Sequence, residues 1–168
     1  MKRIIIFLLI ILSPILQGQS FDKAWASLEK RIRAGEVLSA KEQLEFLDKY
    51  KKDFESYPIQ KSILYNGLGN DAFGNENYKD AISYFNNSIE LAEKAKDTVY
   101  LALYNYDLAT LYNHVGYYAN AEPLYLKALP TLSAYYGQSS IEYTMRFKVL
   151  TEMYVEMGRY NEAKLYND

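Results

Sequence analysis

The chain has 168 residues, with 19 basic side chains, 21 acidic side chains and no cysteine. This mild negative balance, without a basic patch, argues against nucleic acid or an anionic lipid surface as a partner. The absence of cysteine excludes disulfides, thiol nucleophiles and thiolate metal sites in this chain.

The first 20 residues have the composition of a secretory signal peptide. Two basic residues precede the apolar run Ile4 to Leu12, and small residues follow at Gly18 and Ser20. A membrane-spanning helix needs about 20 apolar residues, and this run is shorter. We therefore expect cleavage before Phe21, or after Gly18 as a second choice, and export to the periplasm or the medium. An uncleaved membrane anchor is the alternative.

After removal of this leader about 148 residues remain, which is the length of a single domain. They carry 17 basic and 21 acidic side chains, a net charge of −4. We expect no stable membrane insertion of the cleaved chain. The richness in Ile, Lys, Asn and Tyr, together with the short leader, is typical of a bacterial envelope protein.

The spacing of apolar residues in the remaining chain predicts eight helices and no strand. The expected ranges are 21–34, 37–54 or 39–54, 58–74, 78–96, 97 or 98 to 112, 118–136, 139–157 and 160–168. Asp97 or Thr98 is the expected N-cap of the fifth helix, and Ser139 with Glu142 forms an expected capping box for the seventh. Pro130 lies deep in the sixth helix, where its ring and missing N–H should kink or end it.

The stretch from Leu108 to Leu129 reads as two helices joined by a tight turn, and its skeleton returns 42 residues later. The recurring pairs are Tyr112 and Tyr154, Gly116 and Gly158, Tyr118 and Tyr160, and Ala121 and Ala163. A period of this size indicates a stack of helical hairpins, none of which can bury its apolar face alone.

An alanine near the start of each second helix repeats at similar spacing. The four alanines are Ala40, Ala81, Ala121 and Ala163, at separations of 41, 40 and 42 residues. The residues three places before them are Val37, Tyr78, Tyr118 and Tyr160. Small residues at these positions would let two helices cross closely, so we expect all four alanines to lie at crossings.

This pattern resembles the tetratricopeptide repeat, in particular the 42-residue form of kinesin light chains and bacterial relatives. The resemblance extends over nearly all of the cleaved chain and is most complete from Ser62 to Ala163. It implies an all-α superhelix, a solenoid, of about three and a half hairpins. Residues 21–57 would form a degenerate capping hairpin. Residues 58–168 would form repeats over 58–96, 97–138 and 139–168, the last incomplete.

The sequence contains no motif for hydrolysis, phosphate binding or metal binding, so we expect no catalytic residue, metal or cofactor. The single histidine, His114, is interpreted as a partly exposed residue near a turn, or else as a hydrogen-bonding group that faces a groove. Most tyrosines fall at positions that the repeat assigns to its core. Tyr106 lies outside these core positions, and we expect its side chain to be exposed and to contact a partner.

In such a superhelix the concave face is formed by the first helix of each hairpin, and the resemblance therefore implies a set of partner-binding residues. They are Asn66, Asn70, Phe73, Tyr106, Asp107, Thr110, Asn113, Lys148 and Glu152. This mixed polar and aromatic set suits an extended peptide or loop of a protein partner. The competing interpretation is that each of these residues is simply solvated.

Two functional hypotheses follow. The first is an exported, non-enzymatic scaffold for protein–protein interaction. The second is the N-terminal sensor or scaffold part of a larger bacterial envelope protein with a downstream protease or kinase domain, an arrangement found with similar arrays. The short last helix, from Tyr160, and the apolar surface expected on Ile141 to Met157 predict fraying or self-association through the incomplete repeat. A small-molecule or glycan binder would need an enclosed pocket.

Overall fold

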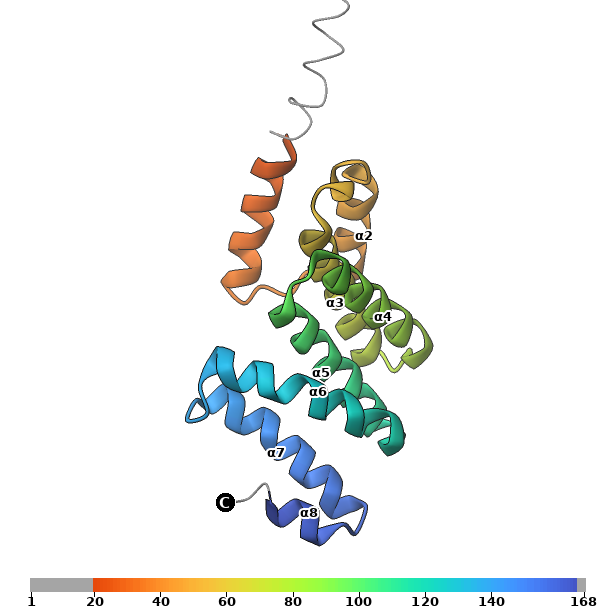
Figure 1. Ribbon diagram of the computed structural model, residues 1–168. Helices are drawn as coiled ribbons and strands as arrows, with labels where there is room; N and C mark the ends of the chain where they lie inside the picture. The colour runs from red at the N-terminus through yellow and green to blue at the C-terminus, as the bar shows by residue number, and fades with distance from the viewer. Residues whose placement is uncertain (1–19, 166–168) are drawn as a thin grey trace, which may run out of the picture.

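The computed structural model describes residues 20–165, and this part of the chain is all-helical, without a strand (Figure 1). A leading helix covers residues 20–33. It is followed by α2 (Ala40–Lys49), the short 3-10 helix η1 (Asp53–Glu55), α3 (Pro58–Gly74), α4 (Tyr78–Ala95), α5 (Thr98–His114), α6 (Tyr118–Tyr136), α7 (Ile141–Glu156) and α8 (Tyr160–Leu165). Residues 1–19 of the signal peptide expected at 1–20, and the expected end of the last helix at 166–168, lie outside the described residues.

Neighbouring helices pack against one another and follow one another along the molecule in chain order (Figure 1). Contacts join α2 to α3, α3 to α4, α4 to α5, α5 to α6, α6 to α7 and α7 to α8. In addition α3 touches α5, so the first helices of two successive hairpins meet directly. Among residues 20–165, no helix combines the length and the apolar composition that a membrane span requires.

Buried apolar residues form three clusters along this row of helices. The N-terminal cluster contains Phe21, Trp25, Leu28, Leu38, Tyr50, Phe54 and Leu64. The central cluster contains Ala72, Ala81, Phe85, Leu108 and Leu111. The C-terminal cluster contains Ala102, Tyr106, Ala109, Ala121, Tyr125, Ala128, Leu129, Leu132, Leu150, Met153, Tyr154 and Ala163. The core is therefore divided along the chain.

The same turn ends the first helix of each hairpin. The second residue after each of these helices has a left-handed backbone: Gly35 (φ 79°), Glu76 (φ 60°), Gly116 (φ 79°) and Gly158 (φ 71°). At Gly116 the N–H donates to the carbonyl of Asn113, and the next N–H donates to the carbonyl of Tyr112. This pair of bonds is the Schellman motif, which satisfies carbonyls that the helix end leaves free. The four left-handed residues lie 41, 40 and 42 residues apart.

The expected equivalence of the first hairpin with the others is wrong in detail. After Glu76, Gly116 and Gly158 a helix begins two residues later, whereas after Gly35 it begins only at Ala40. The longer connection places Val37 in a loop, where it is 88% exposed, and Leu38 is buried in its place. Because Ala40 is the first residue of α2, it does not occupy the crossing position.

The fully buried Ala81 and Ala121 lie one turn inside α4 and α6, as expected for close helix crossings. In α2, Gln43 is buried and the neighbouring Leu44 is 47% exposed, so the inner face begins one residue before the leucine. The shift of one residue in this register follows from the longer connection before α2.

The second helix also ends earlier than expected, at Lys49 rather than Phe54. Tyr50 has a non-helical backbone (φ −107°, ψ 24°), and the chain continues through η1. Tyr50 and Phe54 both lie in the N-terminal cluster, where their rings are near that of Phe21 at 5.5 and 5.2 Å between centroids. The 3-10 helix winds more tightly than an α-helix, and with this change of path both aromatic side chains lie in the same cluster.

The expected break at Pro130 does not end the helix, because α6 runs without interruption from Tyr118 to Tyr136. Pro130 removes the hydrogen bond that the carbonyl of Leu126 would otherwise accept. Both residues are exposed, so water can reach that carbonyl and the helix continues.

The predicted capping box of Ser139 and Glu142 is wrong, because Ser140 is the N-cap of α7. The Ser140 hydroxyl accepts from the N–H of Tyr143 at 3.1 Å and donates to the carbonyl of Gly137 at 2.9 Å. The left-handed Gly137 (φ 86°) begins the turn, and Ser140 is its last extended residue. By contrast, the expected cap of α5 is confirmed, since the Asp97 carboxylate accepts from the N–H groups of Val99 and Tyr100.

Candidate binding face

Two of the predicted partner-binding residues on α3 are joined to one on α5. Asn66 donates from Nδ2 to Oδ2 of Asp107 at 2.9 Å, and Asn70 donates from Nδ2 to Oδ1 of Asn66 at 3.3 Å. The three side chains thus form a polar row across the contact between α3 and α5. We call Asn70, Asn66 and Asp107 the polar row.

Asp107 is only partly exposed as a residue, and its carboxyl group is desolvated. Burial raises the pKa of this carboxyl, while the hydrogen bond from Asn66 and the positive charge of Arg146 act in the opposite direction. Arg146 belongs to α7, so the charge on Asp107 is influenced from the next hairpin along the chain. The carboxyl group at one end of the polar row is therefore influenced both by Asn66 on α3 and by the charge of Arg146 on α7.

Tyr106 is not the exposed contact that the sequence predicted, since it is only 6% exposed. Its hydroxyl donates to the backbone carbonyl of Arg146 at 3.1 Å, and the guanidinium of Arg146 lies 4.6 Å from its ring centroid. The ring also lies 5.0 Å from that of Tyr125 on α6. Burial raises the pKa of the Tyr106 hydroxyl. Tyr106 is thus a packing residue that joins α5, α6 and α7.

Thr110 and Asn113 line the same side of α5, one turn apart. Thr110 donates from Oγ1 to the carbonyl of Tyr106 at 3.0 Å and accepts from the Tyr125 hydroxyl at 3.2 Å. Burial raises the pKa of Tyr125 to about 12, and its hydrogen-bonding contacts with Thr110 and Asn113 oppose that shift. The Oδ1 atom of Asn113 is buried and has no hydrogen-bond partner. An acceptor left in this state is unusual in folded proteins.

Lys148 and Glu152 on α7 contact each other rather than the polar row. Their charged atoms are 3.4 Å apart, and their side chains are 73% and 57% exposed. The α7 residue that reaches α5 is Arg146, which the sequence did not single out. The sequence gives little indication of this role. An arginine that stacks on an aromatic ring of a neighbouring helix can be recognised only once the packing of the two helices is known.

Phe73 and His114 lie together where α3 and α5 end. Their rings are edge to face, 5.2 Å apart, and His114 Nε2 is 3.4 Å from the Tyr78 hydroxyl. His114 is exposed near the turn, and with its nitrogen near this hydroxyl it has features of both interpretations offered for it.

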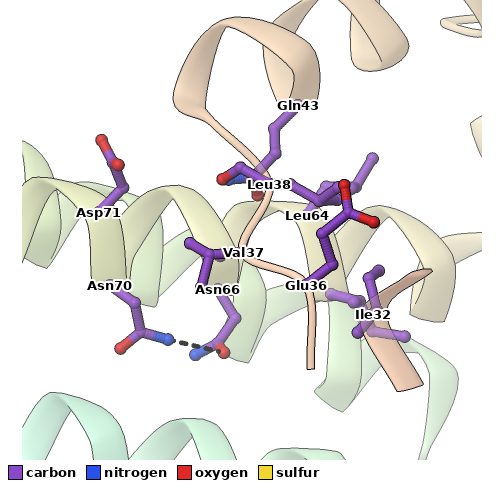
Figure 2. A pocket seen from close by; sticks show the side chains of 11 residues that line it. Ile32, Glu36, Val37, Leu38, Gln43, Leu64, Asn66, Asn70 and Asp71 are labelled. Atoms are coloured by element: carbon purple, nitrogen blue, oxygen red, sulfur yellow. Dashed lines mark hydrogen bonds between the residues drawn. The ribbon is translucent and has the colours of Figure 1, made fainter. Parts of the chain in front are cut away.

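Two hollows flank the polar row. The first, about 340 Å³, lies between α3 and the connection to α2, and Figure 2 shows its lining. It is lined by Ile32, Glu36, Val37, Leu38, Gln43, Ile63, Leu64, Asn66, Gly67, Asn70 and Asp71. Asn66 and Asn70 form one wall of this apolar hollow, and Leu38 and Leu64 lie beside it (Figure 2).

The backbone of α3 approaches α2 closely at this first hollow. Gln43 is buried and donates from Nε2 to the carbonyl of Leu38 at 3.1 Å. A Cβ atom at Gly67 would lie 2.2 Å from Oε1 of Gln43, so the buried amide fills the space that a side chain would need. Gln43 was not among the predicted site residues.

The second hollow, about 440 Å³, lies at the other end of the face. We call it the polar hollow, and it is lined by Phe73, Thr110, Asn113, His114, Tyr118 and Glu156. These residues come from four helices: α3, α5, α6 and α7. The hollow therefore brings together Phe73, Thr110 and Asn113 from the predicted set with Glu156, which the sequence did not indicate.

Within residues 20–165, no group of three or more histidine and acidic side chains is arranged to hold a metal ion. No protein-family model matches this chain, and no curated protein matches it.

Proposed function

We propose that this chain is an exported, non-catalytic scaffold that binds an extended segment of a partner protein across α3, α5 and α7. The proposal includes a stack of hairpins of the tetratricopeptide kind, a solenoid, preceded by a signal peptide that is removed on export. It rests on the sequence pattern and on three structural observations.

The first observation is the recurring turn. Left-handed residues at Glu76, Gly116 and Gly158 each precede a second helix by two residues. The buried alanines Ala81 and Ala121 follow these turns at the same distance. A local geometry that returns at separations of 40 and 42 residues supports a repeating unit of one hairpin.

The second observation concerns the described packing, in which each helix contacts mainly its neighbours in the chain. Stacked repeats show this pattern, because each unit is covered by the next one rather than by distant segments. The direct contact between α3 and α5 places the first helices of successive hairpins side by side.

The observation that carries the binding proposal is the polar row between two hollows. Side-chain amides such as those of Asn66 and Asn70 can donate to and accept from a peptide backbone, which has the same two kinds of group. The apolar hollow beside them would receive a side chain of the bound segment (Figure 2). An extended peptide uses alternate side chains and backbone groups in this way.

The test is selection of binding peptides from a random linear library on the purified chain, followed by NMR mapping of the best binder. We expect changes in the side-chain amide signals of Asn66 and Asn70. The variant Asn70→Ala should weaken binding about fivefold to tenfold, as loss of one hydrogen bond does. Asn70 is exposed, and its recorded side-chain bond is that to Asn66, so the fold should survive.

Asn86→Ala is the matched control, because Asn86 is exposed on α4, a second helix. It should bind the selected peptide as the unchanged chain does. Equal weakening by both substitutions, or signal changes confined to α4 and α6, would refute the proposed face.

Export is tested separately by expressing the full chain in a Gram-negative bacterium and sequencing the N-terminus of the product. An N-terminus at Phe21, or at Gln19, supports the proposed leader. Retention of Met1 in the membrane fraction would instead identify an uncleaved anchor.

A further inference from the structure

The residues that line the polar hollow indicate which kind of ligand side chain would fit there. Its walls come from four helices, and the one carboxylate among the lining residues is that of Glu156. One of the two Glu156 carboxylate oxygens accepts from the Tyr118 hydroxyl at 3.3 Å. The Oδ1 atom of Asn113, another lining residue, is buried and has no hydrogen-bond partner.

Both hydroxyl donors of the hollow are already engaged, and the imidazole of His114, which also lines it, has its Nε2 atom 3.4 Å from the Tyr78 hydroxyl. Thr110 directs its hydroxyl hydrogen to the carbonyl of Tyr106, and Tyr118 directs its own to Glu156. The Asn113 amide lies beside the Tyr125 hydroxyl and lowers its pKa against the effect of burial. Apart from the imidazole of His114, the main hydrogen-bonding group that the lining offers is therefore the Glu156 carboxylate, and a complementary ligand would carry N–H donors.

The charge of Glu156 is also uncompensated among the described residues. The salt bridges found between residues 20 and 165 do not include it. The nearest basic side chains along α7 and its following turn have other partners: Lys148 pairs with Glu152, and Arg159 pairs with Glu122 and Glu162. A carboxylate that lies at the rim of a hollow without a basic partner attracts a cation.

We infer that the polar hollow binds an arginine side chain of the partner segment. A guanidinium has five N–H donors in a planar fork and no acceptor, which suits the Glu156 carboxylate. Its planar face also packs well on aromatic rings, and Phe73 and Tyr118 line the hollow. This inference rests on the proposed function, since it names the kind of residue that the partner presents at one end of the face.

The test uses two heptapeptide libraries that differ only at the central position, which is arginine in one and citrulline in the other. Citrulline has nearly the same shape but no charge and fewer donors. We expect the arginine library to bind about tenfold more tightly, as loss of a charge-assisted pair predicts. In the variant Glu156→Gln that preference should fall to about twofold or less.

Glu142→Gln is the matched control, since Glu142 lies on the same helix, is also exposed and does not line the polar hollow. It should keep the arginine preference. N-acetylarginine amide is the second probe, because a free guanidinium compound could in principle occupy the same site. It should compete at least tenfold less effectively than the arginine heptapeptides.

The outcomes separate this inference from the proposed function. Equal binding of the two libraries, with NMR changes on α3 and α5, would overturn the arginine site and leave the peptide scaffold standing. Equal effects of the Glu142 and Glu156 substitutions would also overturn it. Competition by N-acetylarginine amide as strong as that of the peptides would refute a peptide as the source of the guanidinium. Failure of both libraries to bind would refute the scaffold as well.

Discussion

Asn66 on α3 donates a 2.9 Å hydrogen bond from Nδ2 to Oδ2 of Asp107 on α5, and this bond joins two successive hairpins through a desolvated carboxylate. Burial disfavours the charged form of Asp107, and the hydrogen bond from Asn66 offsets only part of that free-energy cost. The pair therefore makes the stability of the contact between α3 and α5 dependent on pH.

We predict that Asp107→Asn gains stability relative to the unchanged chain as pH rises. The folded pKa of Asp107 is raised above its ordinary value of 3.8, so the folded chain holds this proton more tightly than the unfolded chain. The resulting stabilisation is complete below pH 3.8 and is lost as pH rises through the folded pKa. Urea unfolding of both proteins at several pH values between 3 and 7, followed by circular dichroism, measures the difference. A difference that is constant with pH, or that shrinks as pH rises, would contradict the prediction.

Two glycines of α3 should respond in opposite directions to alanine. At Gly69 a Cβ atom would lie 2.6 Å from the ring of Phe85, which is fully buried. We expect Gly69→Ala to destabilise the chain by about 1–3 kcal/mol, the usual cost of overpacking a core. The measurement is the change in the free energy of unfolding by urea.

Gly74→Ala is the control for that experiment, because a Cβ atom there meets nothing within 4 Å. The gain in helix propensity should make it neutral or stabilising by up to about 1 kcal/mol. If Gly74→Ala destabilises the chain as much as Gly69→Ala does, contact with Phe85 is not the cause.

Glu76 stands where the other turns have glycine, and its left-handed backbone (φ 60°) is strained for a residue with a Cβ atom. We predict that Glu76→Gly stabilises the chain by about 1 kcal/mol. The reciprocal change, Gly116→Ala, should destabilise it by about 1–2 kcal/mol, since φ is 79° there and the surrounding space is open. Thermal and urea unfolding of both variants measure these effects, and a loss of stability in Glu76→Gly would show that its side chain has another role.

The contact between α6 and Arg159, the residue that precedes α8, should weaken in acid. Glu122 accepts from the Tyr154 hydroxyl at 2.9 Å and from the guanidinium of Arg159 at 2.6 Å. The bond from Arg159 is the main reason that the pKa of Glu122 is below its ordinary value of 4.5. Its stabilising effect is present above pH 4.5 and is lost as pH falls through the lower, folded pKa.

Hydrogen exchange of the α8 amides at successively lower pH tests this, after correction for the intrinsic exchange rate. Protection should fall in acid in the unchanged chain and should be low already near neutral pH in Glu122→Gln. Glu152→Gln, on an exposed pair of α7, should behave like the unchanged chain. Identical protection in all three proteins would show that α8 is held by apolar contacts alone.

Much of the helical organisation can be predicted from the sequence, because its signals are local. The bounds Pro58–Gly74 and Tyr118–Tyr136 agree with the structure, as does the cap at Asp97. The expected cap at Ser139 was wrong by one residue. Two adjacent serines compete there, and the turn at Gly137, which decides between them, depends on backbone geometry rather than residue type.

The candidate face was less predictable, since exposure depends on which helix covers which. Tyr106 lay outside the positions that the repeat pattern assigns to its core, yet it is buried because Arg146 and Tyr125 cover its ring. The polar hollow was missed for the same reason. Glu156 and Asn113 line the same hollow only because α7 packs beside α5 and α6.

The division of the core into three clusters has a consequence for how the chain loses its structure. Trp25 is the only tryptophan and belongs to the N-terminal cluster, so its fluorescence reports on one end of the molecule. Circular dichroism reports on every helix at once. Where clusters come apart at different denaturant concentrations, the two signals will not superimpose, and a single unfolding midpoint will describe only the part of the chain that the chosen signal observes.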